Sequence, residues 1–185
     1  MSIFVIVLLR LAWTPAWATE PPPPGYNVHS VREAAGRRFW RGAAPRLETL
    51  QFLAADARSR GLAATLIDLR QPASRDDRSG KEGRLSPGDE AALAHTLGLR
   101  YASISAMDRS LIGVLRQALR RGDVYLHCMY GVNRTGFATA RYARAENLGV
   151  DRQGLGERDW RDGDAFQRRL ESLPSNAANL LSKFR

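Results

Sequence analysis

The sequence predicts an α/β protein in which helices flank both faces of a central, mostly parallel sheet. Short apolar segments alternate with segments of about ten or more residues that have helical periodicity, which is typical of parallel β-α units. The segment 64–69 is mostly apolar on both faces, as expected for a strand buried between two layers of helices. The chain has 185 residues, enough for a single domain with a substantial core.

The first half of the chain is expected to contain two strands, a helix and a long loop. A short strand over 38–45 leads into a helix over 46–60, in which leucine and alanine recur every three or four positions and form one apolar face. Gly61 ends this helix, and the buried strand 64–69 follows. Residues 70–86 are polar, charged and glycine-containing, which predicts a surface loop.

A second helix has clear signals at both ends. Ser86 is a suitable N-cap, Pro87 fits the first turn and Gly98 ends the helix near Leu97. Two acidic residues in its first turn lie near the positive end of the helix dipole. The remaining elements are a strand over 100–104, a helix from 111 that ends before Gly122, a strand over 123–127 and a helix over 134–147.

The two ends of the chain depart from this alternation. Apolar residues dominate 1–18, and the segment Ala16–Ala18 fits the small-x-small pattern of a signal peptidase site. A proline-rich extended leader is expected over 19–35, and a single domain with a helical C-terminal tail over 36–185. These features predict a periplasmic or otherwise exported protein with no stable membrane insertion after leader removal; an N-terminal membrane anchor is the alternative.

The segment 127–136 has residue types and a spacing that suit phosphate binding. Five residues separate Cys128, the only cysteine, from Arg134. A loop of this length can wrap an oxyanion with backbone N–H groups, and the next helix adds its positive N-terminal end. The planar guanidinium of Arg134 can hold two oxygens at once. In so positive a loop the thiol should have a pKa well below the value of about 8.5 for a free cysteine, and a thiolate beside a phosphoryl group is a nucleophile.

The string His-Cys-x-x-Gly-x-x-Arg-Thr-Gly over 127–136 resembles the signature of the cysteine-dependent protein tyrosine and dual-specificity phosphatases. A buried, inert cysteine would leave Gly131 and Arg134 unexplained, and a rhodanese-like sulfur carrier usually has a shorter loop. The segment 38–45 resembles the opening strand of bacterial members, and 107–109 resembles the acid loop of their periplasmic dual-specificity phosphatases. The resemblance covers roughly residues 38–150.

The resemblance implies a fold with the phosphatase P-loop between the central strand and a helix, and a role for each matched residue. Cys128 is the expected nucleophile and Asp108 the expected acid that protonates the leaving group. His127 and Thr135 support the thiolate. The phosphoryl oxygens are expected to be bound by Met129, Tyr130, Gly131, Val132, Asn133 and Arg134.

Asp108 is the assignment in which this chain departs from the family pattern. It precedes Cys128 by only 20 positions, a shorter separation than the family usually has. The alternative is an aspartate that caps the helix starting near Ser110. Asp76 and Asp77 lie in the 70–86 loop and are expected to be solvated rather than catalytic.

The expected function is that of an exported phosphatase that hydrolyses phosphotyrosine in a phosphorylated protein through a phosphocysteine intermediate, with phosphoserine and phosphothreonine as further substrates under dual specificity. The loop positions between Cys128 and Arg134 are uncharged, whereas phosphoinositide phosphatases of this superfamily tend to carry lysines there. Alternatives are a phosphatase of RNA 5′ ends, nucleotides or inositol phosphates, or a phosphate-binding module without turnover. Export disfavours nucleic acid as a partner.

No cofactor or metal is expected, because the sequence has no dinucleotide fingerprint and its three histidines are widely separated. The net charge is +9, and the basic residues are scattered rather than arranged in a stripe. This distribution favours a solvated basic surface over a surface that attracts anionic partners.

Overall fold

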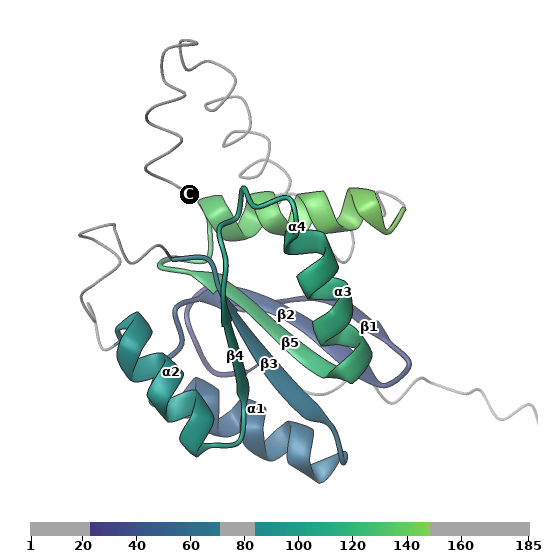
Figure 1. Ribbon diagram of the computed structural model, residues 1–185. Coiled ribbons are helices and arrows are strands. Elements are labelled where there is room, and N and C mark those ends of the chain that lie inside the picture. The colour runs from purple at the N-terminus through teal and green to yellow at the C-terminus, as the bar shows by residue number, and fades with distance from the viewer. Residues whose placement is uncertain (1–22, 71–83, 149–185) are drawn as a thin grey trace, which may run out of the picture.

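The computed structural model of the protein describes residues 23–70 and 84–148, which form a five-stranded sheet between two layers of helices (Figure 1). The strands lie in the order β1-β2-β5-β3-β4, and all neighbours are parallel except β1 and β2. The strands are β1 His29–Ala34, β2 Arg37–Ala43, β3 Ala63–Asp68, β4 Arg100–Ser103 and β5 Gly122–Cys128. The helices are α1 Leu47–Ser59, α2 Pro87–Thr96, α3 Leu111–Arg121 and α4 Asn133–Ala145.

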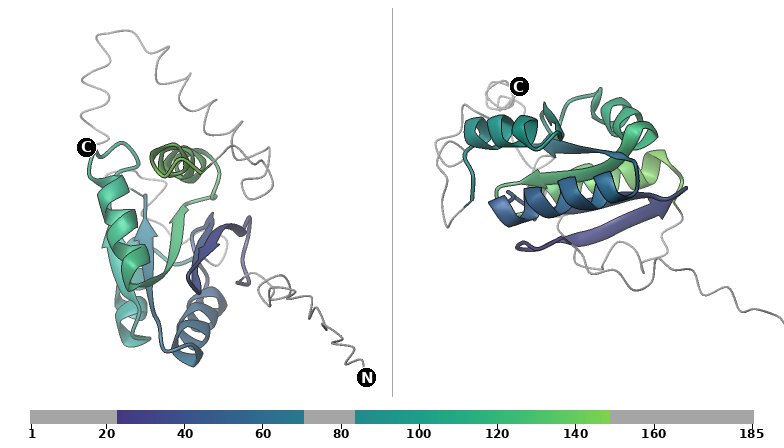
Figure 2. Two further views of the ribbon diagram at one scale, coloured as in Figure 1. Left: turned by 90° about the vertical axis from the view of Figure 1, so that its right-hand side faces the viewer. Right: turned by 90° about the horizontal axis from the view of Figure 1, so that it is seen from below.

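The two faces of the sheet are covered by different helices, which confirms the expected α/β architecture. Helices α1 and α2 pack with one apolar cluster, whereas α3 and α4 pack with the other (Figure 2). The central strand β5 is buried along its whole length and pairs with β2 and β3. The parallel strands therefore present their carboxyl ends at one edge, where ligands bind in α/β folds.

The helix-end signals in the sequence act as expected. The Ser86 hydroxyl accepts a hydrogen bond from the Asp89 backbone N–H at 3.2 Å, and Pro87 is the first residue of α2. Gly61 and Gly98 follow α1 and α2 with positive φ values of 65° and 76°. Each expected strand and helix within the described residues lies within a few residues of its predicted bounds.

The N-terminal part of the domain differs from the prediction. Residues 29–34, expected in an extended leader, form β1 and pair antiparallel with β2. The turn at Ala35 and Gly36 has φ values of 53° and 71°, the pattern of a tight hairpin. Polar residues dominate β1, and Val31 is its member in the apolar core, so the strand has a weak hydrophobic pattern.

Several predicted features lie outside the described residues. These are the signal peptide over 1–18, most of the 70–86 loop with Asp76 and Asp77, and the helical C-terminal tail. Among the residues that are described, none of the helices combines the length and apolar character needed to span a membrane.

Candidate active site

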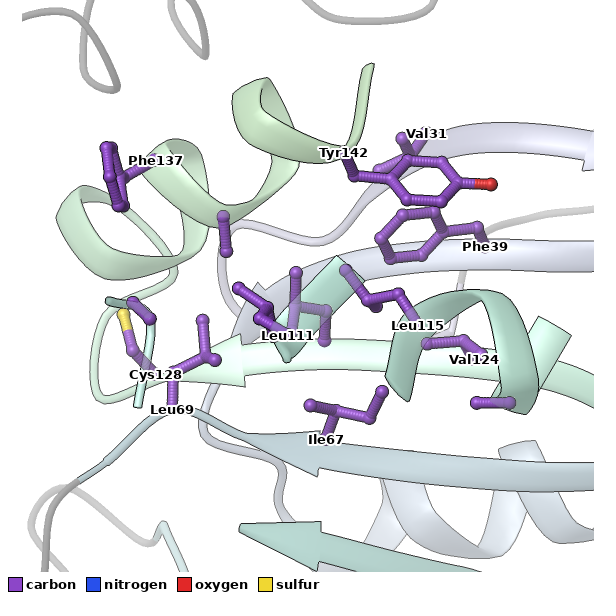
Figure 3. Packing of buried hydrophobic residues seen from close by; sticks show 14 of the residues in the cluster. Val31, Phe39, Ile67, Leu69, Leu111, Leu115, Val124, Cys128, Phe137 and Tyr142 are labelled. Carbon is purple, nitrogen blue, oxygen red and sulfur yellow. The ribbon is translucent and has the colours of Figure 1, made fainter. Parts of the chain in front are cut away.

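The segment after β5 forms the loop that the sequence predicted as a phosphate cradle. Cys128 ends β5 and is only 4% exposed, and α4 begins five residues later at Asn133. Figure 3 shows Cys128 at the end of the strand, with Leu69 beside it. The Leu69 N–H donates to the His127 carbonyl at 2.8 Å, and the Ala44 N–H donates to the Met129 carbonyl at 3.1 Å. The loop is therefore held by the ends of both neighbouring strands.

Gly131 is required by the close approach of the loop to β2. Its φ is 71°, a left-handed conformation that glycine adopts without strain. A Cβ at this position would lie 2.4 Å from the Gly42 carbonyl carbon and 2.6 Å from the Ala43 nitrogen. Those atoms belong to backbone and cannot rotate away, so any side chain would push the loop off the strand.

The environment of the Cys128 thiol favours the thiolate. Burial raises the pKa of this thiol, but the nearby Thr135 hydroxyl, the charge of Arg134 and the N–H groups of Thr135 and Gly131 together lower it below its ordinary value. The Thr135 hydroxyl is buried and has no hydrogen-bond partner among the described residues. The supporting role of Thr135 stays a prediction.

Arg134 lies in the first turn of α4, where its charge adds to the positive end of the helix. Its Nη1 donates to the Leu69 carbonyl at 3.3 Å, so the guanidinium spans from α4 to the carboxyl end of β3. The described arrangement places a cation, a helix N-terminus and a buried thiol around one point. Such a site can bind a tetrahedral oxyanion and hold it against the sulfur.

A buried network of charged residues lies beneath the loop. Arg70 donates to both carboxylate oxygens of Asp68 at 2.8–3.0 Å and to Glu90 Oε2 at 2.5 Å. His127 Nε2 lies 2.8 Å from Glu90 Oε1, and the Tyr101 hydroxyl donates to Asp68 at 2.8 Å. Four of these side chains are almost fully buried, so β3, α2 and β5 are tied together by ion pairs directly under the cradle.

The same network sets the charge of His127. Burial lowers the pKa of this imidazole, but the negative charges of Glu90 and Asp68 outweigh burial and raise it. Asp68, Glu90 and His127 also have ligand atoms within 4.8 Å of one another, a grouping that could hold a cation. The Arg70 guanidinium already binds both carboxylates and supplies that positive charge. The members of this cluster are distant in the chain, so no pattern in the sequence indicates it.

Asp108 lies at the same edge of the sheet, in the turn between β4 and α3. Its Oδ1 accepts hydrogen bonds from the backbone N–H and the hydroxyl of Ser110, each at 2.7 Å. These bonds lower the pKa of the Asp108 carboxyl, which is fully exposed. In the described conformation it bonds to Ser110, which is the N-cap residue of α3 and makes no side-chain cap hydrogen bond, so the catalytic role and the capping alternative both stay predictions.

Arg141 connects the Asp108 turn to the helix behind the cradle. Its Nη1 donates to the carbonyls of Ala106 at 2.7 Å and Asp108 at 3.1 Å. Because Arg141 is on α4, it sets the position of the turn relative to the P-loop. The sequence shows Arg141 only as part of a helical pattern, and nothing in that pattern indicates this contact.

Residues before β1 form a rim at the cradle. Tyr26 and Tyr130 are 62% and 47% exposed, and the Arg84 guanidinium carbon lies 5.6 Å and 4.9 Å from their ring centres. Asn27 Nδ2 donates to the carbonyls of Tyr130 and Gly131 at 3.3 Å and 3.0 Å. Tyr26 and Asn27 lie in the segment that was expected to be an extended leader, and no pattern in the sequence indicates these contacts.

Comparisons with known proteins bear on the fold. No family model matches the sequence, and no curated protein matches it. A DUF442 protein from Shewanella putrefaciens is 16% identical, with a TM-score of 0.52 over 79% of this chain and 87% of its own. The core catalytic domain of Siw14, a PP-IP phosphatase from S. cerevisiae, is 17% identical, with a TM-score of 0.51 over 86% of this chain and 93% of its own.

The chain has the fold of the cysteine-dependent phosphatases. This phosphatase fold brings Cys128, Gly131 and Thr135 together, with Arg134 adjacent. Side-chain exposure varies along the loop, with Met129 buried and Asn133 exposed at the start of α4, while the predicted phosphate contacts of these residues are made by their backbone. Val132 is partly buried between them, and His127 lies beneath the loop.

Proposed function

We propose that the protein is a phosphatase that cleaves phosphate monoesters through a phosphocysteine intermediate. The observation that carries this proposal is the placement of the buried Cys128 thiol, which ends β5 directly before the loop and the N-terminus of α4, where the charge of Arg134 and the loop N–H groups lower its pKa. A buried thiolate under an anion-binding loop and beside a helix N-terminus is suited to attack phosphorus. A purely structural cysteine would gain nothing from these surroundings.

The reaction has two steps. In the first, Cys128 Sγ forms a bond to phosphorus, the bond from phosphorus to the leaving oxygen breaks, and Asp108 gives that oxygen a proton. Arg134 and the loop N–H groups hold the charge on the remaining oxygens. In the second, water attacks phosphorus, the P–S bond breaks, and Asp108 takes the proton from water. For this role the Asp108 carboxyl must exchange Ser110 for the leaving oxygen.

The proposed substrate is phosphotyrosine in a phosphorylated protein, with export to the periplasm as the proposed location. The rim supports an aromatic leaving group, because Tyr26 and Tyr130 are exposed beside the cradle and Arg84 lies close to both rings. Aromatic rings favour offset or edge contacts with another aromatic ring. The loop itself offers no lysine to a polyanionic substrate.

The second candidate substrate is an inositol pyrophosphate or another polyphosphate. The likeness to the PP-IP phosphatase Siw14 favours this class. The uncharged loop residues favour phosphotyrosine instead, because a second phosphate group would find no cation among them.

Turnover of para-nitrophenyl phosphate by wild-type protein and by Cys128→Ser tests the proposal. The variant should retain less than about a hundredth of the wild-type rate, because its hydroxyl is a far weaker nucleophile, and should still bind inorganic phosphate. A higher residual rate contradicts covalent catalysis by Cys128. Phosphate binding without turnover in the wild type identifies a binding module. A panel of phosphopeptides, inositol phosphates and triphosphate-ended RNA then separates the substrate classes.

A further inference from the structure

Asn27 makes two hydrogen bonds to the phosphate loop from its outer side. Its Nδ2 donates to the Gly131 carbonyl at 3.0 Å and to the Tyr130 carbonyl at 3.3 Å, across more than 100 positions of sequence. These are carbonyls of two successive residues in the middle of the loop. One side chain therefore fixes the direction of two consecutive peptide groups.

The planarity of the peptide bond gives this contact a consequence inside the cradle. In a trans peptide the C=O and the following N–H point in opposite directions. No cis peptide bond occurs in the described residues. When the Tyr130 carbonyl points at Asn27, the Gly131 N–H must point the opposite way, and that N–H is one of the groups that lower the pKa of the Cys128 thiol. The Gly131 carbonyl likewise turns the Val132 N–H away from Asn27.

The position of Asn27 is itself fixed. His29 Nε2 lies 2.8 Å from Asn27 Oδ1, so the amide oxygen faces β1 and the amide nitrogen faces the loop. The Ala43 N–H donates to the Tyr26 carbonyl at 3.1 Å, which ties the preceding residue to β2. Asn27 has a φ of 55°, a left-handed conformation that asparagine tolerates better than most residues.

We propose that Asn27 is a positioning residue of the cradle, which turns the Gly131 and Val132 N–H groups inward by holding the carbonyls of Tyr130 and Gly131 outward. This role rests on the proposed function and adds a residue from outside the signature motif. The segment before β1 is thereby part of the active site. Loss of the amide donor should let the two peptides rotate, weaken phosphate binding and make the thiol harder to ionise.

Two substitutions at position 27 in the full-length protein test this role. Asn27→Asp keeps the side-chain size and tolerates left-handed φ but loses both donors. Asn27→Gly removes the donors without adding charge. Both should raise the pKa of Cys128, measured from the pH dependence of its alkylation by iodoacetamide. Both should also weaken the binding of inorganic phosphate, measured as protection of Cys128 from alkylation, by roughly three- to tenfold, as expected for one or two hydrogen bonds.

Asn147→Asp is the matched control. Asn147 is exposed after α4, has a φ of 48° and lies outside the loop, so this variant should leave the thiol pKa and phosphate binding unchanged. His29→Ala frees the Asn27 amide to rotate without changing position 27. It should shift both measurements in the same direction by less, and it serves as the test if the position 27 variants do not fold.

The outcomes separate this role from the proposed function. The proposed positioning role of Asn27 is overturned if folded Asn27→Gly has the wild-type thiol pKa and phosphate binding. If only Asn27→Asp shows a shift, the added negative charge causes it and the positioning role is wrong. Both readouts are independent of turnover. If wild-type protein shows no Cys128-dependent hydrolysis, the proposed function fails while these measurements still decide whether Asn27 orients the loop.

Discussion

The phosphate loop and the Asp108 turn lie at the same edge of the sheet but are held in very different ways. The loop is bonded to β2 and β3, packed backbone to backbone against Gly42, and lies above a buried ion-pair network. The Asp108 carboxylate is fully exposed and bonded only to Ser110 in the described part of the chain. One half of the proposed catalytic apparatus is fixed, and the other depends on a local turn.

This difference matches what each half must do. Stabilising charge on a phosphoryl group requires donors that are already oriented, because reorienting them during the reaction costs free energy. A general acid must meet leaving groups of different shape and must lose and regain a proton within each turnover. A carboxyl held by exposed hydrogen bonds can exchange partners, whereas a residue in the buried network cannot do so without breaking an ion pair.

The largest effect is expected from removing the acid. Asp108→Asn keeps the acceptor for Ser110 but cannot donate a proton to the leaving oxygen. Cleavage of phosphotyrosine should slow by roughly 10² to 10³-fold, because a phenol with a pKa near 10 leaves poorly without a proton. Cleavage of an aryl phosphate with a much more acidic phenol should slow far less. Steady-state kcat/KM on the two substrates measures the difference.

Asp76→Asn and Asp77→Asn are the controls for this prediction. Each should leave the ratio of the two rates unchanged if Asp108 is the acid. An equal loss on both substrates in Asp108→Asn assigns the residue to structure or binding. If Asp108→Asn loses no activity on either substrate, the general acid lies in the 70–86 loop, or the natural substrate has a leaving group that needs little protonation.

The next effect concerns the fixed half. Glu90→Gln removes the charge that faces both Arg70 and His127, leaving two buried cations with one fewer partner. The free energy of unfolding should fall by about 3 kcal/mol, as expected when one member of a buried ion pair is removed. Urea unfolding measures this. Glu146→Gln breaks the partly exposed pair with Arg116 and should cost less than about 1 kcal/mol.

The Glu90 effect should also depend on pH, with a definite sign. The pKa of His127 is raised in the folded protein, so its stabilisation is complete below the unfolded value of about 6.5 and is lost as pH rises through the folded value. The stability difference between wild type and Glu90→Gln should therefore be larger near pH 6 than at alkaline pH. A constant difference would mean that His127 is neutral throughout.

The sequence predicted the features that local rules determine. Residues 127–136 carry their chemistry in a contiguous motif, and Ser86 and Gly61 mark helix ends through local backbone geometry. It missed β1, whose mostly polar sequence shows no clear alternation of apolar residues. A weak strand of this kind is specified by pairing with β2, which is a long-range property.

The parts of the site that the sequence missed all depend on contacts between distant segments. In the sequence, Glu90 is an ordinary acidic residue in the first turn of a helix, but in the fold it lies beneath the loop beside His127. The sequence places Asn27 in the expected leader, but in the fold its side-chain amide donates a hydrogen bond to the Gly131 carbonyl. No spacing rule relates these positions, because the fold alone brings β5, α2 and the segment before β1 to one edge.

The smallest effect tests whether the Asp108 turn is part of the chemistry. The Ser110 hydroxyl donates to Asp108 Oδ1 at 2.7 Å and helps to lower the pKa of that carboxyl. Ser110→Ala removes this bond and leaves the backbone donor, so the pKa of Asp108 should rise part of the way toward its ordinary value. A general acid works only while protonated, and the rate therefore falls as pH rises through its pKa. In Ser110→Ala the alkaline limb of kcat/KM for phosphotyrosine should move to higher pH.

Two comparisons make this shift specific to Asp108. Ser105→Ala removes a hydroxyl that accepts from the Met107 N–H in the same turn and should leave the limb in place. In an Asp108→Asn background the limb should already be absent, so adding Ser110→Ala should change nothing further. If Ser110→Ala leaves the limb unmoved while Asp108→Asn abolishes it, Asp108 releases Ser110 before the proton is transferred. The acid would then act from a second position of the turn, and the contrast between a fixed cradle and an adaptable acid would be sharper still.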